Sequence, residues 1–196
     1  MWRVRLTAIS AFLLVPLAFA AATFPAYPIK QAKECPVSAE NAGLVVGLEP
    51  VENSETQENY FHTELAKKGF VPVFLVIENR TSTNSFIFDK TIVSYGISDS
   101  TISTPLTESG AGKAIAVSVI PFVGPFAGVK IISDAAQIQQ NLMKKEIQST
   151  TLSPGASVHG FLYVPIPRKT ARGKITLRVP ISKASTNETF DLNLVF

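Results

Sequence analysis

Residues 70–79 read FVPVFLVIEN, and this stretch decides the fold class. It is a near-continuous apolar run, rich in branched side chains, that Glu78 and Asn79 close. A short apolar run without a polar face is typical of a β-strand that is buried on both sides. The sequence therefore predicts a central strand at this position.

Shorter strands are predicted around this run. Residues 44–48 (LVVGL) predict a strand that ends near Pro50, and the polar, acidic residues 51–64 predict a loop. After a turn of Thr, Ser and Asn residues, Phe86 and Phe88 share one face of the next strand.

The later part of the chain alternates between apolar and other side chains. A period of two places each apolar set on a single face of a strand. The sets are Val93, Tyr95 and Ile97; Val158, Gly160, Leu162 and Val164; Ile175, Leu177, Val179 and Ile181; and Phe190, Leu192, Leu194 and Phe196. Short strands separated by turn signals predict an antiparallel β-sandwich. Pro180 is expected to face outward on an edge strand.

Residues 110–148 have a helical composition inside this β pattern. The 16 residues between Lys113 and Lys130 carry no charge, and the segment Pro121–Pro125 is expected to end a first helix. One apolar stripe then follows a helical spacing through Ala127, Ile131, Ala135, Ile138 and Leu142. The sequence therefore predicts a helical hairpin inserted between the two halves of the sandwich.

The apolar hairpin, residues 113–132, is the predicted contact element. Its predicted contact residues are Ile120, Phe122, Val123, Phe126, Val129 and Ile131. The hairpin either covers a face of the sandwich or packs on a second copy, or it inserts into a membrane surface, or it encloses a ligand cavity against the sheet. Each arm is shorter than the roughly 18 residues that a membrane-spanning helix needs.

The N-terminus predicts export. Arg3 and Arg5 precede an uncharged apolar stretch, and small residues offer cleavage sites after Ala20 and Ala22, which is the layout of a signal peptide over residues 1–22. The protein is therefore expected outside the cytoplasm, in the periplasm, on the cell surface or secreted. Removing both arginines leaves 16 Lys+Arg against 15 Asp+Glu, without the basic excess of a nucleic-acid-binding protein.

Residues 23–42 hold three prolines without any period and predict an extended leader to a β-sandwich domain over residues 43–196. The single cysteine, Cys35, lies in this leader. An unpaired cysteine in an exported protein either bonds to another chain or stays free. We expect a free thiol in a flexible segment.

Catalytic chemistry is not apparent in the sequence. Residues 110–113 (GAGK) lack the upstream glycine and the following Ser or Thr of a phosphate-binding loop. His62 and His159 have no acidic neighbours at metal-ligand spacing. No catalytic, cofactor-binding or metal residue is therefore predicted, and no cofactor; a hydrolase with a dispersed site is the remaining enzyme alternative.

Charge is distributed unevenly along the chain. Residues 34–64 carry seven acids and no Lys or Arg, and residues 168–183 carry six bases and no acid. These runs either form two opposite patches that steer partners or are neutralised within the fold. Asn79 and Asn187 begin glycosylation sequons, which matter only in a eukaryotic secretory pathway.

Three stretches resemble the immunoglobulin-like domains of extracytoplasmic bacterial proteins. They are VPVFLVIENRT (71–81), FIFD (86–89) and LSPGASVHGFLY (152–163), and the resemblance covers residues 44–105 and 150–196 but not the hairpin. It implies an immunoglobulin-like antiparallel sandwich that binds or scaffolds, and it supplies no catalytic residues.

The predicted function is thus a non-enzymatic, exported interaction or scaffolding protein of the cell envelope. Its expected partner is another envelope protein or a second copy, bound through the hairpin, and no nucleic acid. The alternative is a membrane- or lipid-binding protein that inserts residues 113–132.

Overall fold

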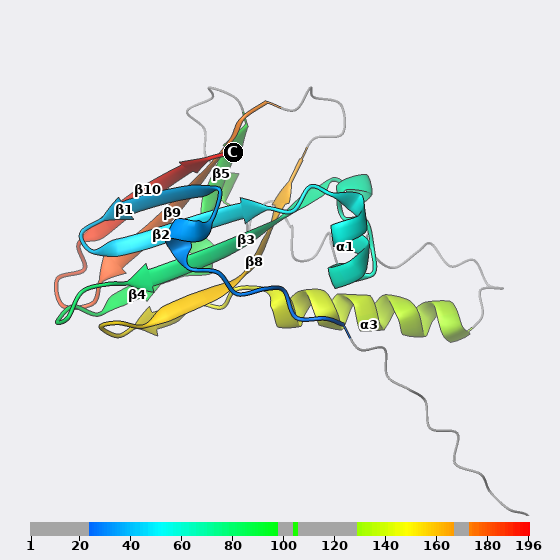
Figure 1. The fold of residues 1–196 in the computed structure, drawn as a ribbon, viewed down its shortest axis with the longest axis horizontal. Helices are drawn as coiled ribbons and strands as arrows, with labels where there is room; N and C mark the ends of the chain where they lie inside the picture. Colours follow the sequence, from blue (N-terminus) through cyan, green and yellow to red (C-terminus); the bar gives the residue numbers. More distant parts are fainter. Residues whose placement is uncertain (1–23, 98–103, 106–128, 167–172) are drawn as a thin grey trace, which may run out of the picture.

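The computed structural model describes residues 24–97, 104–105, 129–166 and 173–196. These residues are mainly β and form two antiparallel sheets (Figure 1), which confirms the predicted fold class at this level. Sheet A has the order β1-β2-β3-β8, with β1 at Val37–Asn41, β2 at Leu44–Pro50, β3 at Phe70–Asn79 and β8 at Ser157–Pro165.

Sheet B has the order β6-β5-β9-β4-β7, and β10 pairs with β9. Its strands are β4 (Phe86–Phe88), β5 (Ser94–Ile97), β6 (Thr104–Pro105), β7 (Thr150–Leu152), β9 (Ile175–Lys183) and β10 (Thr189–Val195). The strand β9 is therefore the centre of the sheet, since β10 runs along one side of it and β4 and β5 share the other.

The main core lies between the two sheets. It contains the inward side chains of β2, β3 and β8 from sheet A and those of β4, β9 and β10 from sheet B. The predicted alternation is confirmed on β9, where Leu177, Val179 and Ile181 have no exposed surface. Burial of each such side chain contributes about 1.5–3 kcal/mol to folding.

Helices cover the other face of sheet A. Figure 1 shows α1 (Ser54–Phe61) and α3 (Val129–Lys145) on the same side of this sheet. A second apolar cluster fills the space beneath them and includes Phe74 of β3 and Phe161 of β8. The strand β3 is therefore buried on both faces, as its unbroken apolar run predicts. The described connections also contain three short 3-10 helices, η1 (Ala32–Glu34), η2 (Ala66–Lys68) and η3 (Lys90–Ile92).

The loop predicted over residues 51–64 is wrong, because α1 lies within it. Asn53 caps this helix, since its Oδ1 accepts a hydrogen bond of 2.9 Å from the Thr56 N–H. Only Gln57 and Phe61 are buried along its eight residues, so the sequence of α1 looks almost uniformly polar. Two inward residues are too few to give a visible helical period.

The prediction for Pro180 is also wrong. Pro180 is buried in β9, which is an interior strand. It lies between Ile181, the last position paired with β4, and Arg178, the first paired with β5. Because no strand pairs with β9 opposite Pro180 on that side, the missing N–H is tolerated inside the sheet.

The predicted leader is in part a structural element. Residues 37–41 form β1, which pairs with β2 along its whole length, so sheet A begins before the predicted boundary at residue 43. Cys35 is only 6% exposed, and its Sγ donates to the Gln31 carbonyl at 3.7 Å. The predicted free thiol is thus a buried one, and the prediction of a flexible segment around it is wrong. Burial raises the pKa of this thiol.

Of the predicted helical hairpin, the structure describes the second arm as α3. Ile120, Phe122, Val123 and Phe126 lie outside the described residues, and the backbone of Val129 and Ile131 lies in the first turn of α3. The predicted signal peptide also lies outside them. No helix in the described part of the chain is long and apolar enough to cross a membrane.

Candidate functional site

The second half of α3 is fixed to the outer face of sheet A. Leu142 is 2% exposed, and its carbonyl accepts a 2.8 Å hydrogen bond from the buried Tyr163 hydroxyl of β8. Asn141 donates from Nδ2 to the Tyr60 carbonyl of α1 at 2.9 Å. Burial raises the pKa of Tyr163 well above its usual value, so this hydroxyl remains a donor. Two polar anchors and one apolar anchor therefore hold this end of the helix.

The amphipathic pattern of α3 is confirmed where its side chains are described. Ala135 and Leu142 are buried and Ile138 packs on the second apolar cluster, whereas Lys144 is exposed. Asn141 departs from the pattern, since its polar side chain is buried against α1.

An N-terminal segment crosses the same face beside α3. We call residues 24–36 the strap; its aromatic centre is Tyr27, whose ring lies 4.9 Å from that of Phe74 and 5.0 Å from that of Phe161. Lys30 forms an ion pair with Glu49 of β2 at 2.7 Å. Burial, with Glu49 nearby, raises the pKa of Tyr27. The strap is thus part of the folded domain.

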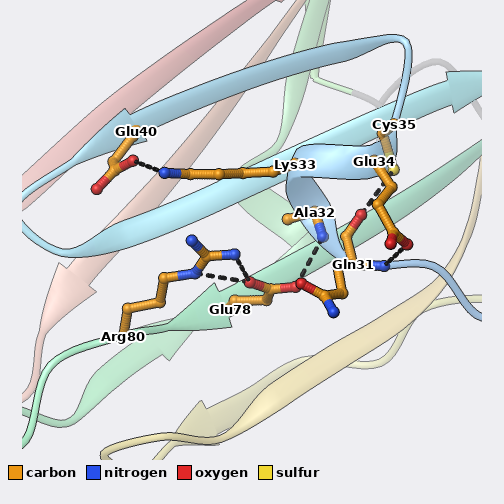
Figure 2. Close-up of polar contacts among 8 residues, drawn as sticks. All are labelled: Gln31, Ala32, Lys33, Glu34, Cys35, Glu40, Glu78 and Arg80. Carbon is orange, nitrogen blue, oxygen red and sulfur yellow. Dashed lines mark hydrogen bonds and ion pairs between the residues drawn. The ribbon is translucent and has the colours of Figure 1, made fainter.

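The helix η1 of the strap is held by one carboxylate of β3. Figure 2 shows Glu78 between the strap and Arg80: its Oε1 accepts the Ala32 N–H at 2.7 Å, and its Oε2 accepts from Nε and Nη2 of Arg80 at 2.9 and 2.7 Å. Within η1, the Glu34 carboxylate accepts the Gln31 N–H at 2.8 Å. These bonds fix the register of the strap on sheet A.

Close packing at Gly47 gives a test of the strap. A Cβ on Gly47 would lie 2.2 Å from the Ala32 carbonyl oxygen, so Gly47→Ala must displace η1. We expect a loss of about 2 kcal/mol of unfolding free energy from this overpacking, together with faster alkylation of the Cys35 thiol in the native protein. Ser38→Ala is the matched control, because Ser38 of β1 is the strand partner of Gly47 but its side chain is exposed. Unchanged alkylation in Gly47→Ala would show that the packing of η1 on Gly47 does not keep Cys35 buried.

A groove of about 730 Å³ lies between the strap, α3 and β8. Tyr27, Phe74 and Phe161 are part of its aromatic lining. The remaining lining residues that concern its chemistry are Phe24 and Ile29 from the strap, Gln140, Lys144 and Lys145 from α3, and Glu146 and His159. The sequence suggested a ligand cavity only between the hairpin and the sheet. The sequence predictions missed this groove because the lining comes from four segments that are far apart in the chain, namely the strap, β3, α3 and β8. Phe24 and Tyr27, two aromatic residues in an otherwise unpatterned leader, are a signal that could have pointed to it.

The two histidines occupy different surroundings. His62 ends α1 in the left-handed conformation (φ 54°), and its ring lies 4.4 Å from that of Phe24. His159 is exposed on β8, with its ring 6.0 Å from Phe74. Among the described residues, no group of three or more His, Cys, Asp or Glu side chains is placed to hold a metal ion.

The acidic run is partly neutralised by lysines that flank or follow it. Lys33 pairs with Glu40, Lys30 with Glu49 and Lys67 with Glu64. In the basic run, Arg178 pairs with Asp191 at 2.7 Å, while Arg168, Lys169 and Arg172 lie outside the described residues. The described charges thus favour local neutralisation over two opposite patches.

No protein-family model matches this chain, and no curated protein shows significant similarity to it.

Proposed function

We propose that the protein is a non-enzymatic, exported interaction protein of the cell envelope, which contacts its partner through the helical hairpin. The observation that carries this proposal is the attachment of α3. Its second half is held by Asn141 and Leu142, while the predicted contact residues all precede that half in the sequence. This end of α3 is thus attached at a fixed place on sheet A, which supports a contact role for the predicted hairpin.

The composition of the hairpin supports a contact role. Apolar segments without charge are unfavourable on a solvated surface, and contiguous exposed apolar patches mark interaction sites. The uncharged run between Lys113 and Lys130 leads directly into α3. The immunoglobulin-like resemblance of residues 44–105 and 150–196 supports a binding module, for which the two antiparallel sheets provide a scaffold.

Site-specific photo-crosslinking in cells tests the proposal. A photoreactive amino acid at Phe122 is expected to give an adduct of defined mass, because Phe122 is a predicted contact residue. The control position is Asn193, which is exposed on β10 of the other sheet. An adduct with twice the mass of the chain indicates a second copy, and a different mass indicates another envelope protein. Equal adducts at both positions, or none at Phe122, would contradict the proposal.

Two further measurements separate export and membrane contact from this interaction. The intact mass of the chain from the envelope fraction is expected to match cleavage after Ala20 or Ala22; a full-length mass would contradict export by a cleaved signal.

The exported chain is expected not to float with liposomes. If the chain does float, and Phe126→Asp abolishes the flotation, the hairpin binds a lipid surface and not a protein partner.

A further inference from the structure

The groove beside α3 has walls of different chemistry. On the strap side, Phe24 is half-buried and Ile29 is 69% exposed, so both present apolar surface to the groove. On the helix side, Gln140 and Lys144 are exposed polar residues that line the same groove. A ligand in the groove therefore meets an apolar wall and a polar, cationic wall at once.

The charge of the groove is positive at the end of α3. Lys144 and Lys145 lie in the last turn of the helix, where the carbonyl groups favour a cation. The Lys145 ammonium donates to the Pro25 carbonyl of the strap, at 2.5 Å, and Lys144 lies next to it in the lining. Glu146 is the carboxylate in the lining, and Lys90 pairs with it at 3.0 Å. Positive charge thus remains after the ion pairs are counted.

We propose that this groove binds a small anionic amphiphile, with the apolar body of the ligand against Phe24 and Ile29 and its carboxylate at Lys144. The volume of about 730 Å³ lies within the roughly 300–1,000 Å³ of small-molecule sites. The cationic end selects an anionic headgroup, since a cationic one would lie against Lys144 and Lys145. The lining residues are distinct from the hairpin residues 113–132, so this proposal goes beyond the hairpin contact and fails or holds independently of it.

Calorimetric titration of the exported chain with dodecanoate, below its micelle concentration, tests the proposal. One molecule is expected to bind per chain, and dodecyltrimethylammonium is expected not to bind. Lys144→Gln should weaken dodecanoate binding about tenfold, which corresponds to the loss of one ionic contact. Ile29→Asp should abolish it, and because Ile29 is mostly exposed this change leaves the fold intact. Lys67→Gln is the matched control, as Lys67 is exposed and lies outside the groove.

Three results would overturn the proposal. The first is the absence of saturable dodecanoate binding. A groove that is already filled by another part of the chain, or by a second copy, would give the same result. The second is equal affinity for the cationic amphiphile, and the third is equal weakening by Lys67→Gln and Lys144→Gln. Each of these leaves the crosslinking result at Phe122 unaffected, so the two proposals are judged separately.

Discussion

Asn79→Asp should lower the free energy of unfolding by about 4 kcal/mol, because it replaces the donor at the centre of a buried polar network with a carboxylate oxygen. Asn79 is 1% exposed at the end of β3. Its Nδ2 donates to the carbonyls of Asn84, Leu152 and Ser153, at 2.7, 3.1 and 2.9 Å. The substitution places negative charge against three carbonyl oxygens and removes the Nδ2 donor from each, although the Ser153 carbonyl keeps its bond from the Ala156 N–H at 3.0 Å.

The two ends of the Asn79 side chain can be tested separately. Its Oδ1 accepts the backbone N–H and the hydroxyl of Thr81 at 3.1 and 2.7 Å, and an aspartate keeps both bonds. The penalty therefore arises at the donor end of the side chain, from the lost hydrogen bonds and from the buried charge together. It should shrink as the pH falls, because a protonated carboxyl group regains one donor.

Urea denaturation at neutral and acidic pH measures this effect. Asn193→Asp is the control, since it introduces the same charge at an exposed position of β10. We expect the control to change the free energy of unfolding by about 0.5 kcal/mol or less. A loss below about 1 kcal/mol for Asn79→Asp, or a loss that grows at acidic pH, would mean that the three carbonyls are satisfied without Nδ2.

The Asn79 network also gives a physical reason for the sequence motif behind the immunoglobulin-like resemblance. The residues of the EN-R-T stretch hold the end of β3, because Glu78 binds the strap and Arg80 while Asn79 joins the 81–84 turn to the turn before β8. The same contacts bear on the sequon at Asn79, since a glycan on Nδ2 would require this amide to leave its three carbonyls.

Strand periodicity predicted the core between the sheets, because each strand contributes several alternating residues to it. The unbroken run of β3 also predicted burial on both faces, and the apolar stripe of α3 predicted its packing side. These signals are local in sequence, so a single chain displays them.

The groove could not be predicted in the same way. Its apolar wall rests on Phe24, Tyr27 and Ile29, which follow no strand or helix period. Its other walls come from α3 and β8, and only the folded sheet brings them beside the strap. The helix α1 was missed for a related reason. Only two of its residues, Gln57 and Phe61, are buried against the rest of the fold, so its sequence shows no helical period.

Gly160→Val should lower the free energy of unfolding by about 3 kcal/mol, at the upper end of the cost of overpacking a core. A Cβ on Gly160 would lie 2.6 Å from the Ile147 Cα and 2.7 Å from the Ile147 nitrogen. Ile147 is fully buried in the core between the sheets, and its N–H donates to the Phe161 carbonyl at 3.0 Å. Because the atoms in the way are backbone atoms of Ile147, they cannot rotate aside as a side chain can. The segment around Ile147 must therefore move away from β8.

Displacement of Ile147 should also change the groove, because Ile147 follows the end of α3 that carries Lys144 and Lys145. Gly160→Val should therefore weaken dodecanoate binding as well as stability, and the Ile147 amide should lose its protection from hydrogen exchange. Ser157→Val is the control, since Ser157 is an exposed position on the same strand, where a branched residue suits the β conformation. If the Ile147 amide stays protected in Gly160→Val, the added side chain is accommodated by a movement of β8 instead, and the close approach of Ile147 to Gly160 does not hold the segment after α3 in place.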